Sequence, residues 1–353
     1  DPSVCVKRDD KGKVIGIIGR HVDDTASGGA KEAGLDKLFV SLNENHFGVK
    51  DEGLLAHFLS VEYTTTRAGT IAHQNCAVQA LLKKFKMEDA SPVSTPMLIS
   101  RVKDPDWIAK DNPVSATTPY RSLIGGLGYL VCMTRIDIAA SVGILAKFNC
   151  NPQKCHWEAA KRVLKYLKGE PAIGINLGFA DRRGMRGQAD DVLECFVDAS
   201  YADCAETRRS RTGYLFRLNG TIIDWKSKKQ PIVATSSCEA EVIALHSAVM
   251  RGVYIKGVAE ELGFKIGKIV YHEDNRSAKF FAQGNGLTKR TKHFAVKFLS
   301  IQERVKNGNI TIEDISTKDQ LADLLTKPLD QGTFGKLRDL LMMRADTEPA
   351  KTG

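Results

Sequence analysis

The sequence lacks a long hydrophobic run. Its most apolar stretches, residues 14–18 and 127–133, are far shorter than the ~20 residues that a membrane-spanning helix needs. It also lacks a charged-then-apolar signal segment at its start. We therefore expect a chain that neither spans a membrane nor is secreted.

The sequence lacks a cysteine framework as well. Its 8 cysteines include no CxxC pair, and the neighbouring Cys150, Cys155 and His156 have no second ligand pair of the kind that zinc sites use. We expect reduced thiols, an intracellular location and no zinc centre. The first residue is Asp1 rather than Met, which favours a piece of a longer reading frame.

The composition has neither the low hydrophobicity nor the extreme charge of a disordered chain. Hydrophobic residues make up 42% of the 353 residues, which is enough to bury a core, and the length predicts two or three domains. Lys and Arg number 51 against 42 Asp and Glu, a net charge of +9, and the excess is spread over both halves. Such a charge fits a polyanionic partner and is also common in soluble proteins.

The first half of the chain reads as short strands followed by helices. A buried strand is expected at 14–18, running into the segment HVDD, and a Pro/Ser/Thr-rich stretch at 91–96 reads as a linker or an extended crossing strand. Apolar periodicity predicts helices at 77–87, 120–134, 136–148 and 156–168. The polar, glycine-containing segment 181–191 reads as a boundary.

After residue 191 the pattern becomes that of a mixed α/β sandwich. Asn219-Gly220 is a hairpin-turn signal between two of the expected strands. The strands are expected at 193–197, 212–218, 222–225, 268–271 and 310–315. The helices are expected at 237–262, 275–283, 292–306 and 318–325.

Four carboxylates stand at places where they can converge. Asp198 ends the first of these strands, Glu241 sits in the first turns of the long helix, Asp274 follows the fourth strand, and Asp323 lies in the last short helix. Such a cluster is costly unless divalent cations neutralise it, and hard oxygen ligands suit Mg²⁺ or Mn²⁺. Two ions ~4 Å apart could then hydrolyse a phosphodiester.

The motifs around these acids carry a family resemblance. The run from Asp198, DASYADCAETRRSRTGYLFRLNGTIIDWKSKKQP, with ATSSCEAEVIAL, YHEDNRSA, TKRTKHF and STKDQLADLLTKPL, resembles the ribonuclease H domain of copia-type LTR retrotransposon Pol polyproteins. Upstream, TPYRSLIGGLGYLVCMTRIDIAASVGILAKF and HWEAAKRVLKYLKG are similar to the segment that precedes that domain. HVDD, FLSVE and VQALLKKFKMEDASPVSTPM resemble the palm and thumb end of the reverse transcriptase.

The resemblance implies a fold and a division into domains. The fold is α/β (α+β), with a C-terminal ribonuclease H-like mixed β-sheet flanked by helices, preceded by a partial reverse transcriptase palm and thumb and a helical connection. The implied ranges are 1–97 for the partial reverse transcriptase, 98–190 for the connection, 191–330 for the ribonuclease H-like domain and 331–353 for a C-terminal tail.

The resemblance also implies an activity. It is hydrolysis of the RNA strand of an RNA–DNA hybrid by water activated between two Mg²⁺ or Mn²⁺ ions, leaving a 3′-hydroxyl and a 5′-phosphate. RNA would be selected through its 2′-hydroxyls in the minor groove. The implied partners are the hybrid and the rest of the Pol polyprotein, with no membrane. The implied location is the cytoplasm, in a virus-like particle, or the nucleus.

Asp198, Glu241, Asp274 and Asp323 fall where the family's metal-binding, catalytic acids fall. Glu239 is the rival for the helix position. We favour Glu241, because Ser236-x-x-Glu239 forms a capping box and Glu239 should point away from the sheet. Other acids read as surface or capping groups: Asp203, Glu273, Asp314 and Asp319.

Nucleic-acid contacts are expected from the same motifs, at Ser236, Asn275, Lys292 and His293. His293, in the family's TKH element, is either a phosphate contact or a surface histidine. The basic residues near the hairpins are either phosphate contacts or a solvated face: Arg208, Arg209, Arg211, Lys226, Lys228 and Lys229. Trp157 and Trp225 read as packing residues.

The polymerase motif departs from the family. His21 replaces the tyrosine before Asp23 and Asp24, and Ser60 and Ile136 replace the family's usual glycine and proline. We expect Asp23 and Asp24 to be vestigial, because the other metal-binding aspartate and the fingers are missing from the sequence. Two alternatives are an inactive or domesticated nucleic-acid-binding relic, and a transposase or integrase core, against which the TSSCEAE and LADLLTKPL elements speak.

Overall fold

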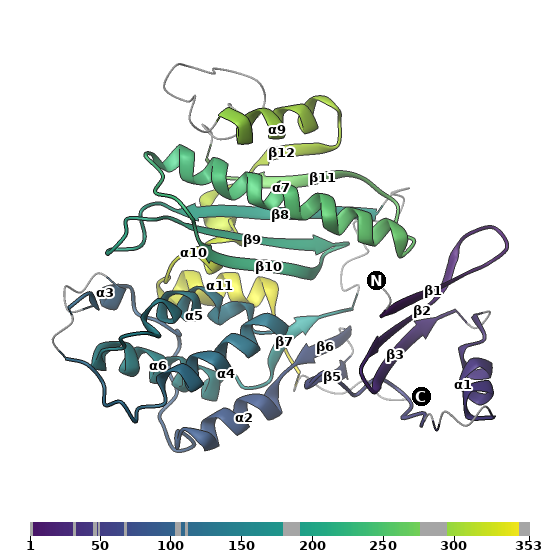
Figure 1. Ribbon diagram of the computed structural model, residues 1–353, viewed down its shortest axis with the longest axis horizontal. Coiled ribbons are helices and arrows are strands. Elements are labelled where there is room, and N and C mark those ends of the chain that lie inside the picture. Colours follow the sequence, from purple (N-terminus) through teal and green to yellow (C-terminus); the bar gives the residue numbers. More distant parts are fainter. Residues whose placement is uncertain are drawn as a thin grey trace.

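The computed structural model describes residues 3–30, 33–44, 48, 50–66, 69–102, 107–109, 112–178, 191–275 and 295–345. In these ranges the chain forms three sheets with helices between them (Figure 1). In Figure 1 a five-stranded mixed sheet lies above a helical layer that has a sheet of its own, and the N-terminal sheet lies to the right of both. Arg8 of the N-terminal sheet donates to the carbonyl of Glu261 at 2.7 Å.

The N-terminal sheet is a three-stranded antiparallel meander, and helix α1 (Leu35–Glu44) follows it. Its strands are β1 (Val4–Arg8), β2 (Val14–His21) and β3 (Asp24–Gly29). The HVDD segment is the tight turn between β2 and β3, and Val22 there has φ of 52°. The strand expected at 14–18 is thus confirmed and extends to His21, but the expectation that it is buried is wrong, since Gly16 alone in β2 is buried.

The middle sheet has the order β13-β7-β6-β5-β4. Its strands are β4 (His57–Phe58), β5 (Val61–Thr66), β6 (Gly69–His73), β7 (Ile173–Asn176) and β13 (Met343–Arg344). The helices of this layer are α2 (Asn75–Lys84), α3 (Ile99–Val102), α4 (Tyr120–Met133), α5 (Ala139–Leu145) and α6 (Lys154–Gly169).

The helix expected at 136–148 is instead three short pieces, with single 3-10 turns at Ile136–Ile138 and Ala146–Phe148 on either side of α5. A buried ion pair lies at the first of these turns. Arg135 lies 2.7 Å from Asp137, and the hydroxyl of Tyr166 donates to the same carboxylate oxygen. These contacts hold the backbone at Arg135 and Asp137 in place inside the core, directly before α5.

The mixed sheet has the order β10-β9-β8-β11-β12, in which β8, β9 and β10 are antiparallel and β11 and β12 run parallel to β8. Its strands are β8 (Asp191–Ser200), β9 (Arg211–Leu218), β10 (Thr221–Lys229), β11 (Ile266–Glu273) and β12 (Ile310–Asp314). Asn219 and Gly220 have positive φ, as a two-residue hairpin turn requires. All five expected strands are confirmed.

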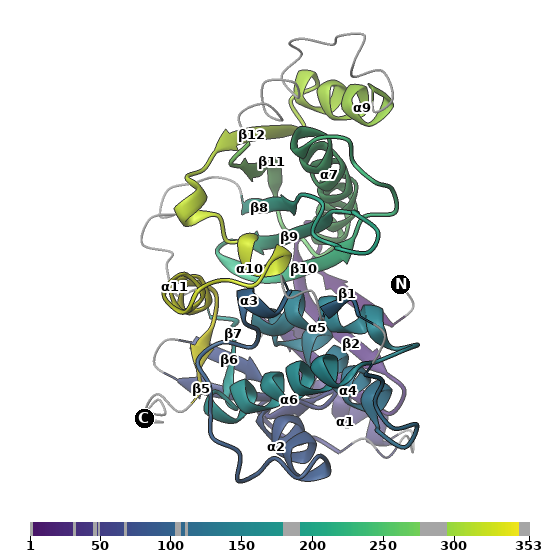
Figure 2. The ribbon, with the colours of Figure 1, turned by 90° about the vertical axis from the view of Figure 1, so that its left-hand side faces the viewer.

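Helices cover both faces of this sheet. On β8, the alternate residues Leu193, Cys195 and Val197 belong to the core with helix α7 (Ser237–Glu261), whereas Phe196 belongs to the core with α10 (Asp323–Thr326). Period-2 alternation therefore places α7 and α10 on opposite faces, and Figure 2 shows α7 end-on beside the strands. α7 is long and apolar enough to cross a membrane, but half of that stretch is buried inside the fold.

The remaining helices differ from expectation at their ends. The helix expected at 292–306 is α9 (Ala295–Lys306). Of the helix expected at 275–283, residues 276–283 lie outside the described residues. The helix expected at 318–325 is a 3-10 turn, Thr317–Asp319, then α10. Gln320 separates them because its side chain donates to the carbonyl of Val197, 2.9 Å away, which holds the backbone extended.

The last described elements return to the middle layer. Helix α11 (Gln331–Leu341) places Phe334 against the ring of Tyr166, 5.4 Å between centroids, and β13 pairs with β7. Arg338 lies 3.1 Å from Glu170 at the end of α6. The division at 97, 190 and 330 stays a prediction, and the segment after 330 packs on elements that come before 178.

Candidate metal centre

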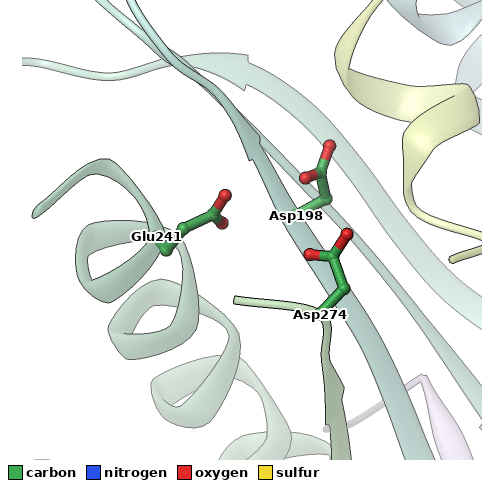
Figure 3. Close-up of side chains that lie close together, drawn as sticks. All are labelled: Asp198, Glu241 and Asp274. Carbon is green, nitrogen blue, oxygen red and sulfur yellow. The ribbon is translucent and has the colours of Figure 1, made fainter. Parts of the chain in front are cut away.

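Three carboxylates meet at one end of the mixed sheet. Asp198 lies near the end of β8, Asp274 directly follows β11, and Glu241 faces them from the second turn of α7 (Figure 3). One ligand oxygen from each lies within 4.8 Å of the others. The structure thus brings together three of the four acids that the sequence predicts as one group.

The topology explains this meeting. β8 and β11 are parallel neighbours, so their carboxyl ends open at the same edge of the sheet. The start of α7 is fixed at that edge by Ser236, whose side chain accepts a hydrogen bond from the backbone N–H of Glu239 at 3.1 Å. Glu241 is then one turn inside the helix, facing the strands.

The electrostatics of the three acids fit a cation. Glu241 is buried, and burial, followed by the charges of Glu273 and Asp198, raises its pKa well above the usual range. Its Oε2 is buried without a hydrogen-bond partner among the described residues. A buried, ionised carboxylate oxygen that accepts no hydrogen bond is poorly stabilised. Carboxylate oxygens at this spacing are the hard ligands that Mg²⁺ and Mn²⁺ bind.

Asp323, the fourth predicted acid, lies at the border of the group. Its Oδ1 is 2.7 Å from Nζ of Lys327, and the same Nζ is 4.0 Å from Oδ2 of Asp198. Thr326 donates its hydroxyl to Asp198. Burial and the charge of Asp198 raise the pKa of Asp323 to about 7, against the lowering effect of Lys327. The roles of the four acids as metal ligands stay a prediction.

Glu273 is a fifth acid at this edge, and the expectation that it lies at the surface is wrong, although it does cap a backbone N–H. Its side chain is fully buried, and burial raises its pKa well above the usual range. Its Oε1 accepts the backbone N–H of Asn275 at 3.1 Å. The signal was in the sequence, because Glu273 continues the buried alternation of Ile269 and Tyr271 along β11.

Glu239 acts as a cap, as predicted, but with different geometry. Its carboxylate accepts from the backbone N–H and the hydroxyl of Thr235, at 2.6 and 2.7 Å, rather than from the N-cap residue Ser236. Contrary to expectation the side chain is buried, at 3% exposed. Glu239 is not part of the three-carboxylate group.

The other acids named in the sequence analysis lie outside the three-carboxylate group. Asp203 is half-buried and lies 3.3 Å from Arg211. Asp314 and Asp319 are exposed, as expected. Because Arg211 is itself buried in that ion pair, it does not belong to a basic surface, whereas Arg208, Lys226 and Lys228 are exposed.

The predicted nucleic-acid contacts are only partly described. Ser236 is the N-cap of α7, and Asn275 lies next to Asp274 at the edge of the site, half-buried. Lys292 and His293 lie outside the described residues. Trp225 donates its ring N–H to the carbonyl of Val131 at 2.9 Å, which confirms it as a packing residue.

The second predicted acidic pair lies far from this group in the fold. Asp23 and Asp24 are exposed at the β2–β3 turn. Within the described ranges no other carboxylate joins them at metal-binding distance.

Known proteins match the chain along nearly all of its length. It is 33% identical over 352 residues to the retrovirus-related Pol polyprotein from transposon TNT 1-94 of Nicotiana tabacum, covering 98% of this chain and 26% of that protein. It is 32% identical over 325 residues to the corresponding polyprotein from transposon RE1 of Arabidopsis thaliana, covering 92% of this chain and 21% of that protein. The chain thus spans about a quarter or less of these relatives. No protein-family model matches it.

The similar solved structures are more distant in sequence. RNase H1 from Halobacterium salinarum is 16% identical, with a TM-score of 0.30, over 38% of this chain and 93% of that one. The foamy viral protease-reverse transcriptase in complex with an RNA/DNA hybrid is 14% identical, with a TM-score of 0.46, over 85% of this chain and 36% of that one.

The strand order and the helices on both faces make the mixed sheet ribonuclease H-like. The identity to the plant polyproteins extends beyond this sheet, through the helical layer and the N-terminal strands. The chain therefore belongs to the retrovirus-related Pol polyproteins of copia-type transposons.

Proposed function

We propose that this chain carries a divalent-metal-dependent ribonuclease H, which cuts the RNA strand of RNA–DNA hybrids. The observation that supports this most is the group of Asp198, Glu241 and Asp274, with ligand oxygens within 4.8 Å of one another at the open end of the sheet. Acids without a shared ligand are usually spread over the surface, where their charges do not repel one another. Without metal the repulsion is relieved by protonation and by Lys327, and bound divalent cations would let all the carboxylates ionise together.

In this proposal the chain's own residues hold and shape the metal site. Asp198, Glu241 and Asp274 would bind Mg²⁺ or Mn²⁺, and Asp323 would complete the site for a second ion. Bound ions supply an activated water and stabilise the leaving oxygen of the phosphodiester. The buried faces of β8, β11 and α7 keep the carboxylates fixed, so that little rearrangement is needed when ions bind.

The proposal assigns no polymerase activity to this chain. Asp23 and Asp24 are exposed, and among the described residues nothing completes a two-metal site around them. We expect no nucleotide incorporation on a primed RNA template. Extension that disappears in an Asp23→Asn variant would show that a working polymerase centre exists.

The test of the ribonuclease is cleavage by the purified chain of an end-labelled RNA annealed to DNA. We expect cuts in the RNA with Mg²⁺ or Mn²⁺ and none with EDTA, with single-stranded RNA or with duplex DNA. Binding of the hybrid without cutting, in either metal, would favour the nucleic-acid-binding relic instead. Cutting of duplex DNA would point to a transposase-like core.

A further inference from the structure

A lysine ammonium reaches into the carboxylate cluster. Nζ of Lys327 lies 2.7 Å from Asp323 and 4.0 Å from Asp198, and these are the only contacts to acids that the structure records for it in the described residues. At this distance the ammonium forms an ion pair with Asp323, and an ion pair of this kind favours the charged form of both groups. The ammonium is therefore positively charged where it stands.

The position of this charge divides the cluster into two parts. On one side, Asp198, Glu241 and Asp274 present oxygens to one point, and Glu241 keeps a buried oxygen with no donor among the described residues. On the other side, Oδ1 of Asp323 also makes no hydrogen bond among the described residues, but it already has the ammonium of Lys327 at ion-pair distance. A divalent ion that shares Asp198 and Asp323 would lie within a few ångströms of the ammonium, where two positive charges repel strongly.

At Lys327 the backbone is restricted, whereas the side chain is free to change its conformation. Lys327 ends α10 in an extended conformation, with φ of −149° and ψ of 155°, and Pro328 follows it. A residue before proline is held in the extended region, so the backbone is restricted. The side chain itself is 38% exposed, and its four-carbon stem can swing toward solvent without unfolding anything.

We propose that Lys327 is a tethered counter-cation that occupies the Asp323 side of the cluster and keeps the second metal ion weakly bound until a substrate phosphate draws the ammonium away. The first ion binds to the three-carboxylate side without this competition. The consequence is sequential loading, in which the two-ion state forms on the hybrid rather than in the free protein. This inference rests on the proposed function, because it concerns the same site.

The test measures Mn²⁺ binding to the whole chain without nucleic acid, by calorimetry and by electron paramagnetic resonance of free Mn²⁺. We expect the wild type to bind one ion much more tightly than the second. Lys327→Gln should tighten the second ion at least tenfold and change the first by less than threefold. Lys327→Arg, which keeps the charge, should leave the second ion weak.

The matched control is Lys256→Gln. Lys256 is paired with Glu260, and it lies fifteen residues after Glu241, which is about 22 Å along α7. This variant should change neither ion's affinity. Equal changes in Lys256→Gln and Lys327→Gln, or an unchanged second ion in Lys327→Gln, would overturn the inference.

A second measurement needs only the wild type. Lysine acetylation by acetic anhydride, read by mass spectrometry, should label Lys327 several-fold faster at saturating Mg²⁺ than in EDTA, with Lys256 unchanged. No difference at Lys327 would contradict the displacement. If two ions bind the wild type equally well, this inference fails and the nuclease proposal stands. If no ion binds at all, the proposed metal-dependent nuclease is wrong, and the inference about Lys327 is wrong with it.

Discussion

Two glutamates on one turn of α7 should respond oppositely to the same change. Glu241→Gln removes a charge from the metal site, so cleavage of the hybrid should nearly vanish. Without metal the variant should be more stable by about 1 kcal/mol, because a buried carboxylate crowded by Glu273 and Asp198 is lost. Hybrid cleavage and urea unfolding in EDTA measure the two effects.

The control is Glu239→Gln. The amide oxygen of glutamine can still accept both hydrogen bonds from Thr235. These two short, buried hydrogen bonds are then made to a neutral acceptor and are weaker than those to the carboxylate. We expect a loss of about 1–2 kcal/mol in stability, larger than for an exposed cap, with cleavage kept. Loss of cleavage in Glu239→Gln with retention in Glu241→Gln would reverse the assignment of the helix acid.

Glu273 allows a separate prediction at the residue scale. Its carboxylate is fully buried beside other acids and accepts a hydrogen bond from the N–H of Asn275. Glu273→Gln keeps that acceptor and removes the charge, so the metal-free protein at pH 8 should gain about 1 kcal/mol of stability. Chemical denaturation in EDTA measures it. A loss of stability would mean that the ionised form is held by donors that the described residues do not include.

At the scale of elements, the seating of α7 on the sheet depends on one glycine. A Cβ added to Gly252 would lie 2.1 Å from the hydroxyl oxygen of Tyr271 and 3.0 Å from the ring of Phe216. Gly252→Ala should therefore destabilise the protein by about 1–3 kcal/mol, although alanine is the better helix former. Thermal and urea unfolding measure the change.

Gly257 on the same helix is the matched control. It is exposed, and a Cβ there meets nothing within 4 Å. Gly257→Ala should raise stability by up to about 1 kcal/mol through backbone entropy alone. If both variants were stabilising, the close contact between α7 and β11 would not exist in solution.

At the scale of the whole molecule, the acidic cluster makes stability without metal depend on pH. The pKa of Asp323 is raised to about 7 from 3.8. The folded state therefore holds a proton that the unfolded state releases, and stability falls as pH rises between about 4 and 7. Burial lowers the pKa of His73, His156 and His246, and these groups act in the opposite sense below about pH 6.5.

The comparison with Asp323→Asn isolates the carboxylate, because the histidine contributions cancel. Relative to that variant, the wild type in EDTA should lose about 2 kcal/mol between pH 5 and pH 8, with little change above that. Mg²⁺ should restore most of the loss in the wild type by binding the ionised group. A difference that stays constant over this pH range would show that Asp323 titrates normally.

The sequence by itself determined the local elements of the ribonuclease H-like sheet and the group of acids around it. Short apolar runs bounded by polar turns placed β8, β9 and β11, and Asn219-Gly220 supplied the left-handed backbone of a hairpin turn. These signals are local, because a strand's period and a turn's φ angles act between residues that are close in the chain. The parallel pairing that such a fold implies then brought Asp198 and Asp274 to one edge.

Only the tertiary structure decided the surroundings of those acids. It buried Glu239 and Glu273, placed Lys327 against Asp323, and returned β13 to pair with β7, which lies nearly half the chain earlier. Whether a charged side chain is solvated or buried depends on which distant elements cover it, and a sequence pattern does not contain that information. The acids could be named from the sequence, but their protonation and their competing cation follow from packing.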